Sequence, residues 1–132
     1  MNAGGINFWG FVAVGAGAAA GAWLRWLLGL RLNPIWPNFP LGTLSANLIG
    51  VYLIGLAIAA LQARPELPPE VRLLIVTGFL GGLTTFSTYS AEVVHLLQRG
   101  QYASAAALAA VHLAGSLLLT VLGFASYRVI SA

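Results

Sequence analysis

The sequence predicts an all-α membrane protein with four transmembrane helices, the third of them broken in mid-membrane. Of its 132 residues, 59% are hydrophobic and only 7% are charged, whereas charged residues make up about a quarter of an average soluble chain. Four apolar runs, at about residues 8–30, 41–61, 71–97 and 102–127, each have the roughly 20 residues that cross a bilayer. These runs consume most of the chain, so we expect one four-span domain (1–132) whose function lies within the membrane.

The charge and cysteine content exclude several classes of function. The net charge of +3 comes from 6 arginines and 3 glutamates, and these few, scattered bases do not form a nucleic-acid-binding surface. The chain has no cysteine, which removes disulfides, thiolate catalysis and cysteine-based metal sites. We therefore expect membrane lipid, and no nucleic acid, among its partners.

The first span carries a packing step and an aromatic end. Gly17 and Gly21 are four residues apart, and such a GxxxG step lets a second helix backbone approach closely. Trp23 and Trp26 match the aromatic belt of a membrane interface, from which Arg25 can reach headgroups or a vestibule. We expect this helix to pack closely at its glycines and to reach the membrane surface near its tryptophans.

The second span follows a loop with three prolines, which preclude a continuous helix. Thr43 and Asn47 are four residues apart and share one helix face. An asparagine amide is unfavourable against lipid, so this face should meet protein or water. Two interpretations stay open for Asn47: a structural interhelical hydrogen bond, worth roughly 0.6–2 kcal/mol, or a functional site.

The third span contains the stretch GFLGGLTTFSTYS at residues 78–90. Glycine readily adopts backbone angles that other residues avoid, so we expect the helix to break at Gly81–Gly82. Irregular polar backbone survives at membrane depth only inside protein or along a wet path, and a broken helix there is typical of an ion site. The alternative is a continuous helix whose hydroxyls bond back to its own carbonyls. The hydroxylated residues are Thr84, Thr85, Ser87, Thr88 and Ser90.

Two further groups of polar residues lie in the last two spans. Glu92 and His95 are three residues apart, but two side chains are too few for a metal site; Glu92 is better placed for a hydrogen bond or the interface. On the fourth span, His112, Ser116 and Thr120 repeat every four residues and predict a polar stripe. His112 is interpreted as a buried hydrogen-bonding residue, with a proton relay as the alternative.

The arginine distribution predicts an unusual topology. Four spans place both termini and the second loop on one side of the membrane. Orientation is normally set by an excess of Lys and Arg on the cytoplasmic side, and here each side has three. The chain can therefore insert both ways and form an antiparallel homodimer. The two groups of arginines are Arg64, Arg72 and Arg128, and Arg25, Arg31 and Arg99.

The polar lining available to this chain suits a small ion. Hydroxyls and the asparagine amide donate hydrogen bonds to an anion, and the positive ring edges of Phe86 and Tyr89 can face an anion as well. Backbone carbonyls at a glycine break would coordinate a cation instead. No carboxylate lies in the middle of the first, second or fourth span, which disfavours a proton-coupled cation transporter.

Three motifs together resemble the Fluc (CrcB) fluoride channel family: GAWLRW at residues 21–26, GTLSANLIG at 42–50 and GFLGGLTTFSTYSAE at 78–92. The resemblance covers the whole chain. It implies a multi-pass protein of the inner (plasma) membrane that exports fluoride passively and limits its cytoplasmic toxicity. It also implies a dual-topology homodimer with two antiparallel pores and a structural sodium ion at the dimer centre.

The resemblance further implies roles for individual residues. The backbone carbonyls of Gly81 and Thr84 would bind the sodium ion. Phe86 would be the first ring of a phenylalanine box, Tyr89 stands where a second phenylalanine is usual, and Asn47 would be a pore-facing donor. The other implied residues are Arg25 at the vestibule, with Thr43, Ser87, Thr88 and Ser116 along a polar track.

Three other functions remain as alternatives. A small multidrug-type proton-coupled exporter would also have four spans, but it would need a glutamate in the first span, where this chain has none. A non-transporting membrane assembly protein would explain the small-residue faces but not the polar third span. An intramembrane enzyme is disfavoured because the chain has no aspartate and no local nucleophile signature around its serines, and we expect no catalytic residue.

Overall fold

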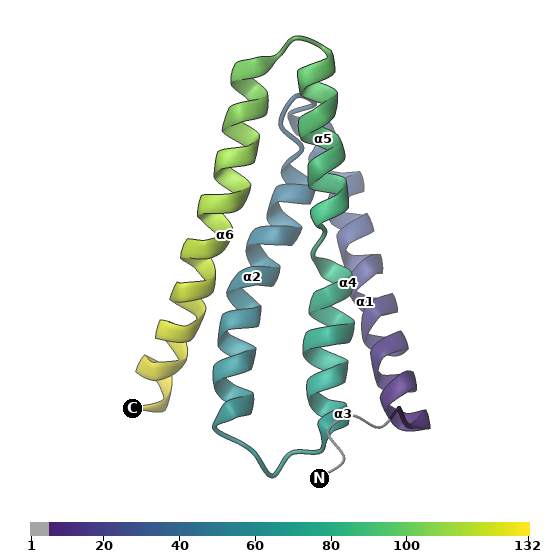
Figure 1. The fold of residues 1–132 in the computed structure, drawn as a ribbon, viewed down its shortest axis with the longest axis vertical. Coiled ribbons are helices and arrows are strands. Elements are labelled where there is room, and N and C mark those ends of the chain that lie inside the picture. The colour runs from purple at the N-terminus through teal and green to yellow at the C-terminus, as the bar shows by residue number, and fades with distance from the viewer. Residues whose placement is uncertain (1–5) are drawn as a thin grey trace.

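The computed structural model describes residues 6–132, which form helices joined by short connections (Figure 1). Four helical stretches are long and apolar enough to cross a membrane, at Phe8–Ile35, Leu41–Gln62, Pro69–Gln98 and Tyr102–Ser131. The expectation of an all-helical chain with four such stretches is confirmed. In chain order the elements are α1 (Phe8–Leu32), η1 (Asn33–Ile35), α2 (Leu41–Gln62), α3 (Pro69–Arg72), η2 (Leu73–Leu80), α4 (Gly81–Leu83), α5 (Phe86–Gln98) and α6 (Tyr102–Ser131).

The third stretch is not one regular α-helix. Its segment η2 is π-helical, a rare form that is frequent near functional sites. Between α4 and α5, the backbones of Thr84 (φ −88°, ψ 153°) and Thr85 (φ −150°, ψ 118°) are extended. Thr85 then begins α5 as its N-cap, because its side chain accepts a hydrogen bond from the backbone N–H of Thr88 at 3.1 Å.

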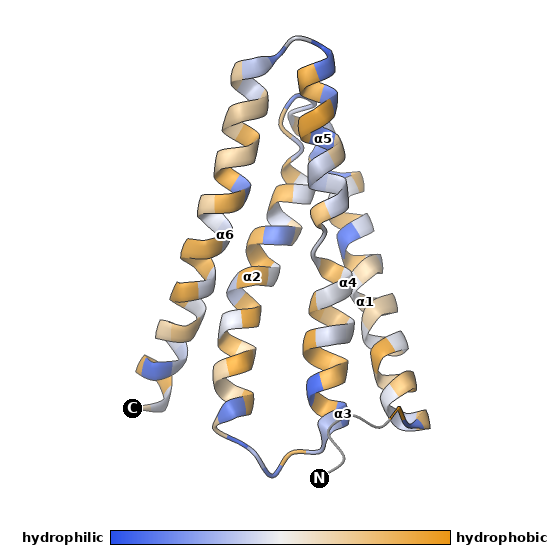
Figure 2. Cartoon of the chain, viewed as in Figure 1, coloured by the Kyte–Doolittle hydropathy of each residue, from blue (hydrophilic) through white to orange (hydrophobic). Residues whose placement is uncertain are grey.

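Both described ends of the chain lie at the same end of the bundle (Figure 1). The connection between α2 and α3 lies there too, while the α1–α2 and α5–α6 connections lie at the opposite end. At the latter, Gly100 has φ +73° and ends α5 in a Schellman motif, with bonds from Gly100 N to Leu97 O and from Gln101 N to Leu96 O. Hydrophilic residues gather at these ends, and apolar residues cover the long middle (Figure 2).

Glycines let the helix backbones approach one another closely. Gly17 and Gly21 of α1 are buried against η2 and α4, and a Cβ atom on Gly21 would lie 2.7 Å from the backbone nitrogen of Leu83. Gly55 of α2 meets Gly123 of α6 in the same way. Small residues permit such close backbone approach in membrane helices, so the predicted packing role of the α1 glycines is confirmed.

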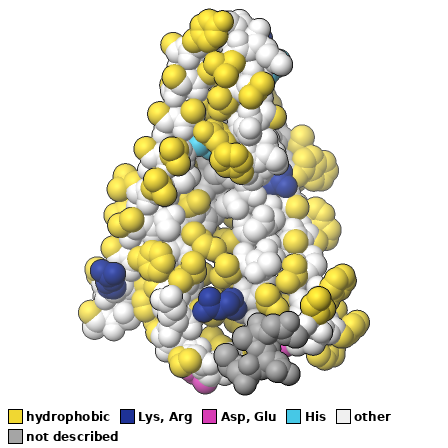
Figure 3. All heavy atoms as spheres, in the orientation of Figure 1, with side chains coloured by type: hydrophobic (Ala, Val, Ile, Leu, Met, Phe, Trp, Pro, Cys, Tyr) yellow, Lys and Arg dark blue, Asp and Glu magenta, His cyan; other side chains and the backbone are white. Residues whose placement is uncertain are grey.

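Most large apolar side chains point outward. Exposed residues include Trp23 and Trp26 on α1 and a row of leucines and valines on α6, and apolar side chains spread over the face in Figure 3 with few charges between them. An apolar surface of this extent is unfavourable in water and suits contact with lipid. The buried apolar core is small and forms two clusters, around Leu83 and around Leu108.

Candidate functional site

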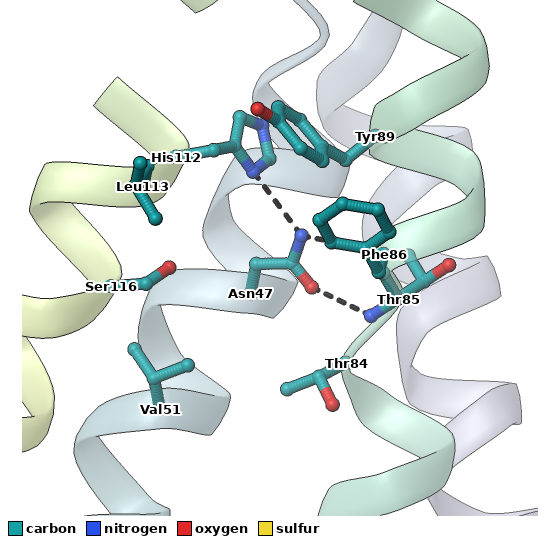
Figure 4. A pocket seen from close by; sticks show the side chains of 9 residues that line it. All are labelled: Asn47, Val51, Thr84, Thr85, Phe86, Tyr89, His112, Leu113 and Ser116. Atoms are coloured by element: carbon teal, nitrogen blue, oxygen red, sulfur yellow. Dashed lines mark hydrogen bonds between the residues drawn. The ribbon is translucent and has the colours of Figure 1, made fainter. Parts of the chain in front are cut away.

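A cavity of about 530 Å³ lies beside the extended segment between α4 and α5. It lies between α6 on the left and the α4–α5 segment on the right, with α2 between them, and side chains from all of them line it (Figure 4). The lining residues are Asn47, Val51, Thr84, Thr85, Phe86, Tyr89, His112, Leu113 and Ser116.

Asn47 of α2 pairs with the backbone of Thr85 through both ends of its amide. Its Oδ1 accepts from the Thr85 backbone N–H at 2.7 Å, and its Nδ2 donates to the Thr85 carbonyl oxygen at 2.9 Å. An extended residue inside a helix leaves its backbone groups without helical partners, which is costly away from water. The buried Asn47 side chain, 8% exposed, replaces those partners and so stabilises the interruption at this position.

The expected breaking point at Gly81–Gly82 was wrong. Gly81 is helical (φ −63°, ψ −37°), and both glycines belong to α4. Gly82 serves close packing instead, since a Cβ atom there would lie 3.0 Å from the Cα atom of Ala18. The helix ends at Leu83, and Thr84 and Thr85 are extended where Asn47 can pair with the backbone of Thr85.

The interruption leaves several carbonyl oxygens without helical partners, among them those of Gly81 and Thr84. In a continuous helix, the backbone N–H groups of Thr85 and Thr88 would donate to the carbonyls of Gly81 and Thr84. Here they donate to Asn47 Oδ1 and to the Thr85 hydroxyl. Within residues 6–132, no other hydrogen bond reaches the carbonyl oxygen of Gly81 or of Thr84. Carbonyl oxygens of this kind are suitable ligands for a small hard cation.

The two aromatic rings at the cavity meet edge to face. The centroids of Phe86 and Tyr89 are 5.4 Å apart at 68°. Tyr89 also stacks on the ring of His112, at 4.5 Å and 31°, and its hydroxyl donates to the carbonyl oxygen of Ala109 at 3.4 Å. Phe86 is 78% exposed, so its ring lies at the open side of the cavity.

His112 is buried, at 3% exposed. Its Nδ1 lies 3.2 Å from Asn47 Nδ2, which confirms the interpretation of His112 as a buried hydrogen-bonding residue. Its Nε2 is also buried, and no hydrogen-bond partner reaches it within the described part of the chain.

The cavity brings together only some of the residues that the sequence singled out. Asn47, Phe86, Tyr89 and Ser116 line it, together with Thr84. The others lie outside its lining. The hydroxyls of Ser87 and Thr88 both hydrogen-bond to the hydroxyl of Thr85. Thr43 donates to Glu92 Oε2 at 2.7 Å. Arg25 Nε donates to the carbonyl oxygen of Gly82 at 3.0 Å, and Gly81 lies in α4.

Three residues of the lining were not predicted from the sequence as site residues. Thr85 was counted among the hydroxylated residues, but its backbone rather than its hydroxyl bonds to Asn47. Val51 lies one helical turn after Asn47 on α2, and Leu113 follows His112 on α6. Helical spacing could have placed Val51 on the Asn47 face, whereas no signal in the sequence distinguishes Leu113 from a lipid-facing leucine.

Comparison with known proteins decides the family. The family model described as "CrcB-like protein, Camphor Resistance (CrcB)" matches residues 12–124. The chain belongs to the CrcB-like family. Similar family members include the "Fluoride-specific ion channel FluC" of Cupriavidus metallidurans, 60% identical over 122 residues that cover 92% of this chain and 97% of that protein. The protein of the same description from Aromatoleum aromaticum is 58% identical over 121 residues, 92% of each chain.

Proposed function

We propose that this CrcB-like chain is a fluoride-specific ion channel, a multi-pass protein of the plasma membrane. The observation that carries the proposal is the likeness of nearly the whole chain to proteins described as fluoride-specific channels, at about 60% identity. Transport is passive. A negative-inside potential drives an anion outward by about 2.3 kcal/mol per elementary charge per 100 mV, and this export limits fluoride in the cytoplasm.

The few polar groups in the largely apolar lining of the cavity support anion conduction. A small anion that leaves water needs donors close by to replace its hydration shell. The Ser116 hydroxyl is such a group, the Asn47 amide lies in the same lining, and the edge-to-face pair of Phe86 and Tyr89 contributes electropositive ring edges. In this proposal the hydroxyls of Thr43, Ser87 and Thr88 extend the path beyond the cavity.

The working unit in this proposal is an antiparallel, dual-topology homodimer, with the Thr84–Thr85 interruption at mid-membrane. The balance of three arginines on each side supports insertion in both orientations. The exposed ring of Phe86 supports a second copy at the open side of the cavity, because the anion path must be closed off from lipid. Each dimer would have two antiparallel pores.

A sodium ion is the structural cofactor in this proposal. The free carbonyl oxygens of Gly81 and Thr84 fit a hard monovalent cation, and two copies of the chain would supply two of each. When bound, sodium would offset negative charge near the anion path. Arg25 adds a positive charge beside Gly82 and lies near the vestibule in this arrangement.

The alternatives are less well supported. A proton-coupled multidrug exporter needs a glutamate in the first span, and Phe8–Leu32 contains none. Glu92 lies in α5 and accepts a hydrogen bond from Thr43. The family consists of ion channels by the description of these relatives, which is not a class of enzymes. A scaffold role leaves the polar groups at the cavity unexplained.

Fluoride efflux from proteoliposomes, recorded with a fluoride-selective electrode, tests the function. We expect rapid fluoride efflux and no chloride efflux from matched chloride-loaded vesicles. Equal efflux of the two anions would contradict selectivity, and efflux of neither would contradict a channel. Proton movement coupled to a drug gradient would favour the exporter.

The absence of cysteine permits a clean test of dual topology. Glu66 lies in the exposed connection between α2 and α3, so Glu66→Cys creates a single reactive thiol at one end of the bundle. A membrane-impermeant maleimide applied to intact cells should label about half of the chains, and permeabilisation should expose the rest. Labelling of all or none before permeabilisation would show a single orientation.

A further inference from the structure

The Asn47 amide has no spare N–H group for an anion. Its two N–H groups meet the Thr85 carbonyl oxygen at 2.9 Å and His112 Nδ1 at 3.2 Å, and an asparagine amide has two donors in all. The bond to Thr85 stabilises the interrupted backbone, so the N–H towards His112 is the one that an anion can take. His112 therefore competes with any anion for this donor.

The pairing also determines which nitrogen of His112 carries the proton. The amide cannot be turned round, because Oδ1 accepts from the Thr85 backbone N–H while Nδ2 donates to the Thr85 carbonyl. Nδ1 of His112 consequently faces an N–H group and must offer its lone pair. The neutral ring then carries its proton on Nε2, the buried nitrogen without a partner within the described residues.

We propose that His112 and Asn47 form a joint site for one fluoride ion and one proton. This inference rests on the proposed function. A proton taken from water onto Nδ1 turns the acceptor into a donor, which ends the bond to Asn47 and leaves two N–H groups at the cavity wall. A fluoride ion that accepts from both completes the site, with the Thr85–Asn47 pairing unchanged.

The surroundings of His112 make proton and anion depend on each other. Asn47 on α2 is uncharged, and on α5 the Tyr89 ring covers the imidazole. Glu92, one turn further along α5, is bonded to Thr43, and within residues 6–132 neither it nor any other acidic side chain forms an ion pair with His112. A buried imidazolium without a counter-ion is costly, so the fluoride ion supplies the missing charge. By linkage, each ligand then strengthens binding of the other by the same factor.

The pH dependence of fluoride efflux tests the inference. As the pH falls from about 8 to about 5, the range in which histidine changes charge, we expect the efflux rate of the unaltered protein to rise about five-fold or more, the lower end of usual coupling between sites. His112→Gln keeps an acceptor for Asn47 but cannot gain a proton, so its rate should stay flat. His95→Gln, which alters the exposed histidine of α5, should behave like the unaltered protein.

Protein-free vesicles correct each rate for leakage of hydrogen fluoride. A His112→Gln variant with the pH dependence of the unaltered protein, or a His95→Gln variant that loses it, would overturn the joint site. Absence of fluoride efflux at every pH would contradict the proposed function. Binding of fluoride and a proton at His112 is then tested by NMR, which does not depend on transport.

Nitrogen-15 NMR of histidine-labelled protein in detergent gives a readout that does not depend on transport. The signal of His112 is assigned by its loss in His112→Gln, or by elimination against His95→Gln if the first variant does not fold. We expect the Nε2–H tautomer without fluoride and a shift towards the doubly protonated ring when sodium fluoride, but not sodium chloride, is added. A resting Nδ1–H tautomer, or no response to fluoride, would overturn the inference.

Discussion

Arg25 Nε donates to the carbonyl oxygen of Gly82 at 3.0 Å and so joins α1 to the short helix that precedes the interruption. In a continuous helix this carbonyl would accept from the backbone N–H of Phe86, which begins α5 beyond the extended segment. Arg25 thus replaces a lost helical partner on the α1 side, as Asn47 does for Thr85 on the α2 side. Both ends of the interruption are supported by side chains from neighbouring helices.

Loss of the Arg25 side chain should destabilise the protein. Arg25→Ala leaves the part-buried Gly82 carbonyl without a donor, which should cost up to the roughly 1–3 kcal/mol of an unsatisfied buried acceptor. Arg31→Ala is the matched control, because Arg31 is exposed in the last turn of the same helix and contributes only about 0.3–1 kcal/mol through the helix terminus. Unfolding in detergent with increasing SDS should show the lower midpoint for Arg25→Ala. Equal midpoints would show that the Gly82 bond contributes little.

Substitution of Gly21 should separate α1 from α4. A Cβ atom there would lie 2.7 Å from the Leu83 nitrogen, and overpacking of this kind costs typically about 1–3 kcal/mol. Gly15→Ala is the control on the same helix, because nothing lies within 4 Å of its added Cβ atom, and alanine should gain up to about 1 kcal/mol in helix propensity. Opposite shifts in unfolding midpoint are expected; a Gly21→Ala variant as stable as Gly15→Ala would contradict the close contact.

Replacement of Asn47 should weaken both the fold and transport. Asn47→Ala leaves the N–H and carbonyl groups of Thr85 unpaired, at roughly 1–3 kcal/mol for each, and fluoride efflux should be lost. Asn47→Asp can still accept from Thr85 N–H but cannot donate to its carbonyl or to His112. Its unfolding midpoint should therefore lie between those of Asn47→Ala and the unaltered protein.

The control for these Asn47 variants is Asn38→Ala, in the exposed connection between α1 and α2, and it should change neither the midpoint nor efflux. Asn47→Ala with normal stability and normal efflux would show that the Thr85 segment does not depend on the amide.

The sequence could predict features that depend on composition and on spacing within one helix. Hydropathy was sufficient for the four spanning stretches, and the four-residue step from Gly17 to Gly21 was sufficient for a close helix contact. The shared face of Thr43 and Asn47 indicated that the amide faces protein. Each of these inferences needs only the helical repeat and the cost of polar groups in lipid.

The position of the interruption could not be predicted, because it depends on contacts between helices. Glycine propensity favoured a break at Gly81–Gly82, but both residues remain helical, and Gly82 packs against Ala18. The backbone becomes extended where Asn47, 38 residues earlier in the chain, can reach Thr85. The contact of Asn47 with His112, across 65 residues, is equally invisible in local spacing.

Removal of the Tyr89 hydroxyl should leave fluoride efflux intact. The hydroxyl donates to the Ala109 carbonyl at 3.4 Å and points away from Asn47 and Ser116 in Figure 4, and loss of such a bond costs at most about 0.5–1.5 kcal/mol. Tyr89→Phe keeps the ring edge at Phe86 and the stack on His112, so proteoliposomes with either protein should empty at similar rates.

Tyr89→Ala removes both ring contacts, worth about 0.5–1.5 kcal/mol for an aromatic pair, and should lose efflux, whereas Tyr102→Ala at the exposed start of α6 should not. Abolished efflux in a folded Tyr89→Phe protein would show instead that the hydroxyl leaves Ala109 and serves as an anion donor.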